Sequence, residues 1–147
     1  MDPLCRPARP DDAIRLFEIR RQSILELAPG GMPADEAVAW AVKLTHEGME
    51  QKLREFEVWI AELDGVAAAW GAICDERLEG LYVAPEFAHQ GVGAGLLLRL
   101  EGLMRERGVR MVRAEASSNA RDFYLRRGYR QMGPQTPDRA WPIAKEL

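Results

Sequence analysis

The sequence lacks the features that mark secreted, disulfide-stabilised and membrane-spanning proteins. Its 147 residues include two cysteines, Cys5 and Cys74, which have neither the spacing of a zinc or redox site nor the density of a disulfide scaffold. No apolar run approaches the roughly 18–20 residues of a membrane-spanning helix. The first five residues also lack the charged and apolar regions of a signal peptide. These absences predict a cytoplasmic protein without a membrane partner.

Internal repeats, low-complexity segments and recognisable linkers are absent from the sequence as well. A chain of 147 residues, of which 47% are hydrophobic, can bury enough surface to fold without metal ions or disulfides. We therefore expect one domain that spans residues 1–147.

Charge is nearly balanced over the chain but uneven along it. The 20 basic and 23 acidic residues give a net charge of −3, which argues against a general nucleic-acid-binding protein. Residues 1–90 carry a net charge of −8, and residues 91–147 carry +5. An anionic ligand should prefer the second half and a cationic ligand the first, although scattered surface charge gives the same counts.

The hydrophobic pattern predicts strands and helices in a mixed order. Asp64-Gly65 is a typical two-residue hairpin turn, Pro29-Gly30-Gly31 should end the first helix, and Gly48 is a candidate break in the second helical region. The strand–helix–strand unit over residues 78–116 should make its two strands parallel. The expected strands are 4–8, 57–63, 66–73, 78–83, 109–116, 129–132 and 142–147, and the expected helices are 13–27, 34–54, one that ends near 107, and 120–127.

The clearest chemical signal is the segment Gly91-Val92-Gly93-Ala94-Gly95 between a strand and a helix. Alternate glycines let the backbone turn tightly and direct successive N–H groups to one point, and the N-terminus of the following helix adds a preference for phosphate. No Lys follows the glycines, as a P-loop requires, and Leu96 stands where a dinucleotide fingerprint needs its third glycine. Another kind of phosphate-binding loop is therefore needed.

Residues 78–133 resemble the acetyl-CoA-binding core of the GNAT superfamily of N-acetyltransferases. The family motif Q/R-x-x-G-x-G/A follows a strand that ends in a Leu-Tyr-Val-like run and a Pro, as Leu81-Tyr82-Val83-Ala84-Pro85 does here. Gly91 and Gly93 match the small positions of the motif. Ala88 takes its first position, where the family usually has Gln or Arg, so a side-chain contribution is missing there.

A second segment, residues 116–129, is similar to the family pattern N-x-x-A-x-x-x-Y-x-x-x-G-[FY]. Ala120, Tyr124, Gly128 and Tyr129 are in register with it. Ser117 takes the usual Asn position, where its hydroxyl can still cap the following helix. The hydrogen bond of that Asn to the pantetheine arm is put in doubt by this departure.

The resemblance implies an α/β (α+β) fold, with a mixed, mostly antiparallel central sheet of six to seven strands. About four helices flank the sheet, and it parts between the fourth and fifth strands. Acetyl-CoA would be the acetyl donor, and no metal is implied. The residues expected to bind it are Leu81, Tyr82, Val83, Ala88, His89, Gln90, Gly91, Val92, Gly93, Ala94, Ser117 and Tyr124. His89 is open to two interpretations, contact with a phosphate or exposure to solvent.

Two residues are expected to carry the catalysis that the resemblance implies. Tyr124 matches the family's usual general acid, since a phenol can protonate a departing thiolate, whereas the alternative is packing beside Phe123. Glu79 is the preferred general base because it shares strand parity with Leu81 and Val83. Glu115 on the parallel strand and Glu76 in the preceding turn are the alternative bases.

The leading hypothesis is transfer of an acetyl group from acetyl-CoA to a primary amine, by direct attack in a ternary complex. The acceptor would be a small-molecule amine or a protein amine, and the acidic first half favours a cationic one. A non-catalytic module that binds or senses acyl-CoA is the alternative, and the departures at Ala88 and Ser117 favour it. The resemblance also implies a possible homodimer. Residues 134–139 either fold over the acceptor site or pair with a partner chain.

Overall fold

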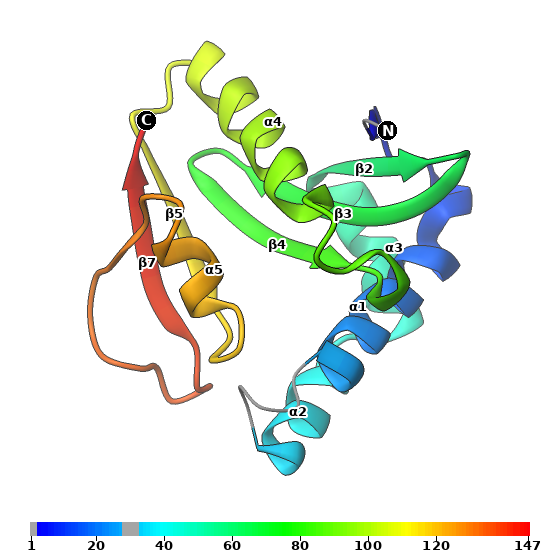
Figure 1. Ribbon diagram of the computed structural model, residues 1–147, viewed down its shortest axis with the longest axis horizontal. Helices are drawn as coiled ribbons and strands as arrows, with labels where there is room; N and C mark the ends of the chain where they lie inside the picture. The colour runs from blue at the N-terminus through cyan, green and yellow to red at the C-terminus, as the bar shows by residue number, and fades with distance from the viewer. Residues whose placement is uncertain (1–2, 28–32) are drawn as a thin grey trace.

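The computed structural model describes residues 3–27 and 33–147, so the predicted stop signal at residues 29–31 lies outside the described residues. Seven strands form one sheet in the order β1-β2-β3-β4-β5-β7-β6 (Figure 1). Every neighbouring pair is antiparallel except β4 and β5, which are parallel, as predicted for the mixed sheet. The strands are β1 (Leu4–Pro7), β2 (Glu57–Leu63), β3 (Val66–Cys74), β4 (Arg77–Val83), β5 (Met111–Ala116), β6 (Arg130–Gln131) and β7 (Trp141–Glu146). The helices are α1 (Ala13–Leu27), α2 (Ala34–Ala41), α3 (His46–Glu55), α4 (Val92–Glu106) and α5 (Arg121–Leu125). Two short 3-10 turns, η1 (Pro10–Asp12) and η2 (Pro85–Phe87), precede α1 and follow β4.

The predicted hairpin turn at Asp64-Gly65 is confirmed. Both residues have positive φ, 53° and 78°, as the favoured two-residue hairpin turns require. Leu63 pairs with Val66 directly across this turn. The turn therefore sets the register of β2 against β3, which lies between β2 and β4 in the sheet.

The predicted helical region at 34–54 is two helices, and the expected break at Gly48 is wrong. Helix α2 ends at Ala41, and α3 begins at His46 with Thr45 as its N-cap. The Oγ1 of Thr45 accepts a hydrogen bond of 3.0 Å from the N–H of Gly48, which places Gly48 in the first turn of α3. A side-chain cap, not the conformational freedom of glycine, thus decides where the chain divides.

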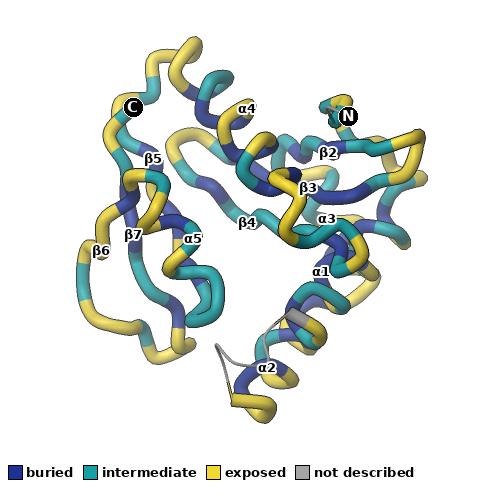
Figure 2. The backbone as a smooth tube through the Cα atoms, in the orientation of Figure 1, coloured by how far each residue is buried: buried dark blue, intermediate teal, exposed yellow. Residues whose placement is uncertain are grey.

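The two faces of the sheet carry different helices. Leu16 and Ile19 of α1 and Met49 of α3 pack against Trp70 on one face, together with other buried residues of β2 and β3. Helices α4 and α5 cover the other face, where Leu100 is fully buried. Most of β3 is buried between these layers (Figure 2).

Helix α4 ends at Glu106, close to the predicted end near residue 107, and Gly108 follows its C-cap. Gly108 has φ 86°, and its N–H donates to the carbonyl of Arg105. The N–H of Val109 donates to the carbonyl of Met104, completing the hydrogen-bond pattern of a Schellman cap. Val109 is therefore part of this cap, which explains why β5 begins at Met111 and not at the predicted residue 109.

Strands β4 and β5 pair over only two residues, at the start of β4 and the middle of β5. Arg77 lies opposite Arg113 and Leu78 opposite Ala114, and no further pair follows. Beyond these pairs the two strands diverge (Figure 1). The predicted parting between the fourth and fifth strands is confirmed, and the edge of β4 from Glu79 to Val83 is left without a neighbouring strand.

A β-bulge interrupts β4 at the point where the strands part. Ala72 of β3 pairs with Gly80, but the next residue, Ile73, pairs with Leu78, so Glu79 is the extra residue of the bulge. Leu78 and Leu81 consequently belong to the same core cluster although their numbers differ in parity. The alternation of side chains along β4 is broken at Glu79.

Candidate active site

The larger of two adjoining cavities lies between the end of β4, the first turn of α4 and helix α5. Its volume is ≈ 540 Å³. Most of the expected acetyl-CoA-binding residues lie in its wall. The residues that line it are Ser23, Leu81, Val83, Phe87, Ala88, His89, Gly91, Val92, Gly93, Ala94, Asn119, Ala120, Asp122, Phe123, Tyr124, Arg126 and Arg127.

The glycine-rich segment forms the N-terminus of α4, and glycine is required at Gly91 and at Gly93 for different structural reasons. Gly91 is the N-cap and has φ 80°, a conformation that residues with a Cβ rarely adopt. A Cβ on Gly93 would lie only 2.9 Å from Cγ2 of Val83, so glycine lets α4 approach β4 closely. The first intrahelical bond from this segment joins the N–H of Gly95 to the carbonyl of Gly91. The N–H groups of residues 92–94 precede it and have no intrahelical acceptor, which suits an anion.

Two arginines in the turn that follows α5 add positive charge to this cavity. Arg126 is exposed at the cavity wall. Arg127 donates a hydrogen bond of 2.8 Å to the carbonyl of Phe123, and its guanidinium lies 3.9 Å from the centre of the Phe123 ring. The net positive charge of the second half of the chain is the sequence signal that could have found these two residues.

The free edge of β4 presents backbone groups to the parting. The N–H of Ala84 donates to the carbonyl of Ala68 on β3 at 2.8 Å. Along an antiparallel strand, successive residues direct their backbone N–H and C=O groups to opposite sides. Tyr82, two residues before Ala84, therefore also directs these groups toward β3, whereas Leu81 and Val83 direct theirs toward the parting. An extended ligand between β4 and β5 could therefore bond to this edge as an added strand does.

The smaller cavity occupies the parting itself and has a volume of ≈ 140 Å³. Carboxylates from both strands, Glu79 of β4 and Glu115 of β5, line it. It shares Leu81, Ala120 and Tyr124 with the larger cavity. Its lining residues are Trp40, Arg77, Leu78, Glu79, Gly80, Leu81, Tyr82, Ala114, Glu115, Ala116, Ser117, Ala120 and Tyr124.

Tyr124 therefore stands at the junction of the two cavities. It is 6% exposed, and its ring contacts Phe123 and Tyr129 edge-on, with centroid distances of 5.2 and 5.3 Å. Burial, with a smaller contribution from Tyr82, raises the pKa of the Tyr124 phenol above its ordinary value. A phenol with a raised pKa keeps its proton at neutral pH, as a general acid must.

Glu79 lies in the parting between β4 and β5, but the strand parity from which it was selected is interrupted by the bulge. Because Glu79 is the extra residue of the bulge, parity with Leu81 and Val83 does not determine its orientation. Its carboxylate accepts a hydrogen bond of 3.2 Å from Nε of Arg77. Of the alternative bases, Glu115 lies in the same cavity, whereas Glu76 lies in a separate surface pocket beside Cys74.

Three of the expected acetyl-CoA-binding residues lie outside the larger cavity. The side chain of Tyr82 is on the opposite face of the sheet and packs against Trp70 at a centroid distance of 5.1 Å. Gln90 is exposed and donates to the carbonyl of Glu86 at 3.4 Å. Ser117 lines only the smaller cavity.

The expected capping role of the Ser117 hydroxyl is wrong. This hydroxyl donates to Oδ1 of Asn119 at 2.6 Å, and the backbone carbonyl of Ser117 accepts from the N–H groups of Ala120 and Arg121. Asn119 lines the larger cavity. An amide side chain thus reaches that cavity from two residues beyond the motif position.

The described residues provide neither a metal-binding cluster nor a membrane-spanning helix. Among residues 3–27 and 33–147, no group of three or more His, Cys, Asp and Glu side chains is arranged to hold a metal ion. No helix in the described part of the chain is both long enough and apolar enough to cross a membrane.

Comparison with known proteins gives one consistent answer. Residues 31–141 match the family described as the acetyltransferase (GNAT) domain. A GCN5-related N-acetyltransferase structure from Rhodopseudomonas palustris is 26% identical, with a TM-score of 0.91 over 100% of this chain and 97% of that one. PaiA N-acetyltransferase from Thermoplasma acidophilum, solved with coenzyme A, is 21% identical, with a TM-score of 0.82 over the whole of both chains.

A larger protein contains the same fold as one part. N-acetylglutamate synthase from Neisseria gonorrhoeae, complexed with coenzyme A and N-acetyl-glutamate, is 19% identical with a TM-score of 0.73. The match covers 100% of this chain and 35% of that one. No curated protein sequence matches the chain significantly.

Proposed function

Because the chain belongs to the GNAT family of acetyltransferases, we propose that it transfers the acetyl group of acetyl-CoA to a primary amine of an acceptor within a ternary complex. The observation that carries the proposal is the position of Tyr124, which lines both cavities at the parting of β4 and β5. A donor in the larger cavity and an acceptor in the smaller one would meet at this side chain.

The larger cavity fits the chemistry of the donor. Its N–H groups at residues 92–94 and the cationic Arg126 suit a pyrophosphate, and the free edge of β4 suits the amide groups of a pantetheine arm. The amide of Asn119 is a further hydrogen-bonding group in the same wall. A bound CoA structure of PaiA, which has this fold, supports the assignment.

In the proposed reaction, the amine nitrogen forms a bond to the thioester carbonyl carbon, and the bond from that carbon to sulfur breaks. The attacking nitrogen must lose a proton, and the departing thiolate must gain one. Tyr124 donates its hydroxyl proton to the thiolate, whose conjugate acid has a pKa near 8.5 in a model thiol. The carboxylate of Glu79 accepts the proton of the amine, directly or through water, and releases it to solvent, while the Tyr124 phenolate regains a proton from solvent, so that both groups are restored.

Two features support Glu79 over Glu115 as the base. The Glu79 side chain is 25% exposed, and Arg77 fixes its orientation through Nε. Glu115 is exposed on β5, and no hydrogen bond or ion pair holds its side chain among the described residues. A held carboxylate is better placed than a freely rotating one to accept a proton at a defined point.

Calorimetric titration with acetyl-CoA, followed by an amine panel assayed by thiol release, tests the proposal. We expect micromolar binding of acetyl-CoA, no binding of ATP, and release of CoA that requires an amine and yields its N-acetyl product. Binding without transfer to any amine would identify the non-catalytic acyl-CoA module instead. Absence of binding to the folded protein would overturn both functions.

A further inference from the structure

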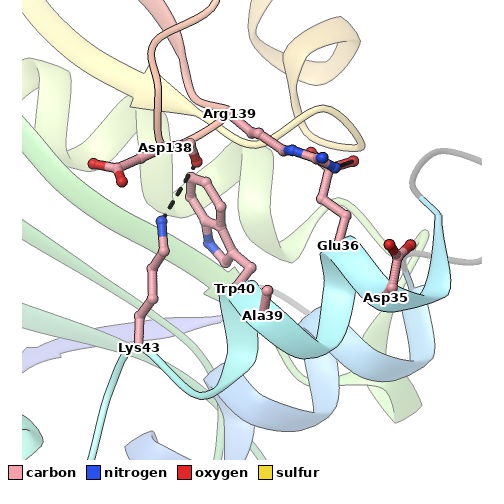
Figure 3. Close-up of a pocket in the computed structure, with 7 residues that line it drawn as sticks. All are labelled: Asp35, Glu36, Ala39, Trp40, Lys43, Asp138 and Arg139. Carbon is pink, nitrogen blue, oxygen red and sulfur yellow. Dashed lines mark hydrogen bonds and ion pairs between the residues drawn. The ribbon is translucent and has the colours of Figure 1, made fainter.

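A third cavity lies outside the parting, between α2 and the segment 134–140 that precedes β7 (Figure 3). Its volume is ≈ 230 Å³. The residues that line it are Asp35, Glu36, Ala39, Trp40, Lys43, Asp138 and Arg139. Helix and segment are about a hundred residues apart in the chain, so the fold itself brings these side chains together.

Both walls of this cavity are held in place. Arg20, which is buried in α1, donates to the carbonyls of Trp40 and Ala41 at 3.0 and 3.1 Å and so anchors the C-terminal end of α2. In the opposite wall, the N–H of Thr136 donates to the carbonyl of Ala140, and the Thr136 hydroxyl accepts from the N–H of Ala140. The cavity is therefore lined by ordered elements on each side.

Two contacts join the walls across the cavity. Nζ of Lys43 donates to the carbonyl of Asp138 at 3.4 Å, and NH1 of Arg139 lies 3.6 Å from Oε2 of Glu36. Figure 3 shows both side chains reaching between α2 and the segment. These contacts hold Asp138 and Arg139 against α2 and the turn that follows it.

Glu36 is the unusual group of this cavity. It is only 8% exposed, and its Oε1 is buried without a hydrogen-bond partner among the described residues. A Glu in the third position of a helix often reaches back to the N–H of the N-cap residue, but the N-cap of α2 is Pro33, which has no N–H. A buried carboxylate oxygen without a donor is costly, so a donor supplied by a ligand would be bound favourably.

The charge of the cavity favours a cation as that ligand. Three carboxylates, Asp35, Glu36 and Asp138, line it beside two cations. Both cations are already engaged: Lys43 lies 4.3 Å from the centre of the Trp40 ring, and Arg139 faces Oε2 of Glu36. The acidic excess of residues 1–90 points in the same direction.

Trp40 connects this cavity with the proposed site of acetyl transfer. Its side chain lines both the cavity of Glu36 and the smaller cavity of Glu79 and Tyr124. An acceptor with one amine in the parting could therefore extend along the indole toward Glu36. An apolar linker would suit this wall, and a second ammonium group would suit its end.

We propose that the cavity between α2 and residues 134–140 binds a second ammonium group of the acceptor through Glu36, so that the acceptors are flexible diamines or longer polyamines. The inference rests on the function proposed above and adds the class of acceptor to it. The unpartnered Oε1 of Glu36 binds the distal ammonium, and Trp40 packs against the methylene chain.

The test compares hexamethylenediamine with hexylamine, a pair that differs by one terminal amine, alongside shorter and longer polymethylene diamines. In the unaltered protein, kcat/KM should be about tenfold or more higher for the diamine and should pass through an optimum of chain length. Glu36→Gln, which keeps the size of the side chain, should raise KM for the diamine about tenfold. The KM for hexylamine and the affinity for acetyl-CoA should stay within twofold.

Two further variants control for charge and for folding. Asp35→Asn removes a charge from an exposed residue in the same cavity wall and should change KM for the diamine less than threefold. Arg139→Gln removes the cation that competes for Glu36 and should lower KM for the diamine, an effect opposite to that of Glu36→Gln. Such opposite effects cannot arise from a general loss of folding.

Each result decides between the two proposals. Equal kcat/KM for diamine and monoamine, or an equal loss on both substrates in Glu36→Gln, overturns the subsite while the acetyltransferase assignment stands. A gain for carboxylate-bearing amines that disappears in Arg139→Gln shows an anion subsite and also overturns it. Failure to bind acetyl-CoA overturns the proposed function and this inference with it.

Discussion

The hydroxyl of Tyr129 donates a hydrogen bond of 2.8 Å to the carboxylate of Glu101, which is 2% exposed inside α4. The other oxygen of Glu101 accepts from Nζ of Lys145 at 3.0 Å. Tyr129 in turn packs edge-on against Tyr124. A buried carboxylate on one helix thus fixes the aromatic wall against which the proposed general acid rests.

Replacement of Glu101 should therefore destabilise the protein. In Glu101→Ala, Lys145 and Tyr129 lose their shared partner, and we expect the free energy of unfolding to fall by about 3–5 kcal/mol, as when one member of a buried ion pair is removed. Glu101→Gln keeps an acceptor for the Tyr129 hydroxyl and should cost less. Urea unfolding of both variants measures the difference, and equal stability of Glu101→Ala and the unaltered protein would contradict the prediction.

Tyr124→Phe should separate chemistry from binding. The ring contacts with Phe123 and Tyr129 are kept, so the fold should be unchanged. Loss of the hydroxyl removes the proton donor, and we expect turnover to fall tenfold or more, in the range typical of general acids. Acetyl-CoA affinity, measured by calorimetry, should barely change. An unaltered turnover number would remove Tyr124 from the mechanism.

The pH dependence of turnover follows from the raised pKa of Tyr124. A general acid is active while protonated, and activity is lost as pH rises through its pKa. Because burial moves this pKa upward, loss of the Tyr124 proton should not reduce kcat below about pH 10, the ordinary range of a phenol. A pH profile of kcat, with circular dichroism recorded at each pH to verify the fold, tests this. A decline near neutral pH that disappears in Tyr124→Phe would show a lowered pKa instead.

Two glycines of α4 offer a matched pair of substitutions. Gly93→Ala would place its Cβ 2.9 Å from Cγ2 of Val83, so the Val83 side chain or α4 must shift, and we expect acetyl-CoA binding to weaken at least tenfold. Gly95→Ala meets no atom within 4 Å and should stabilise the helix by about 0.5–1 kcal/mol without loss of binding. Calorimetry and thermal unfolding report the two effects. Equal binding by both variants would mean that close packing at Gly93 does not shape the donor site.

Local chemistry explains which parts of the fold the sequence could predict. The turn at Asp64-Gly65, the glycine that ends α4 and the parallel strands around α4 depend on neighbouring residues and on chain connectivity. The bulge at Glu79 does not, because it reflects how β4 aligns with β3 across the sheet. Strand parity therefore does not determine the face of Glu79, although the residue lines the cavity at the parting.

The site shows the same division between local and long-range information. Gly91, Gly93 and Tyr124 follow a motif that is continuous in sequence, and they line the larger cavity together. Asn119 lines that cavity although Ser117 occupies the motif position, and the Ser117 hydroxyl bonds to the Asn119 side chain. The cavity of Glu36 depends on contacts between α2 and residues 134–140, and no periodicity within either segment reveals it.

The short pairing of β4 with β5 also has a consequence for how the protein opens. Strands β1–β4 form one ladder and β5–β7 another, joined by two register pairs and by the packing of α4. In native-state hydrogen exchange, the amides of these ladders should report two separate opening reactions. A ligand bonded to β4 along the parting would bridge the ladders, and their exchange should then become a single cooperative event.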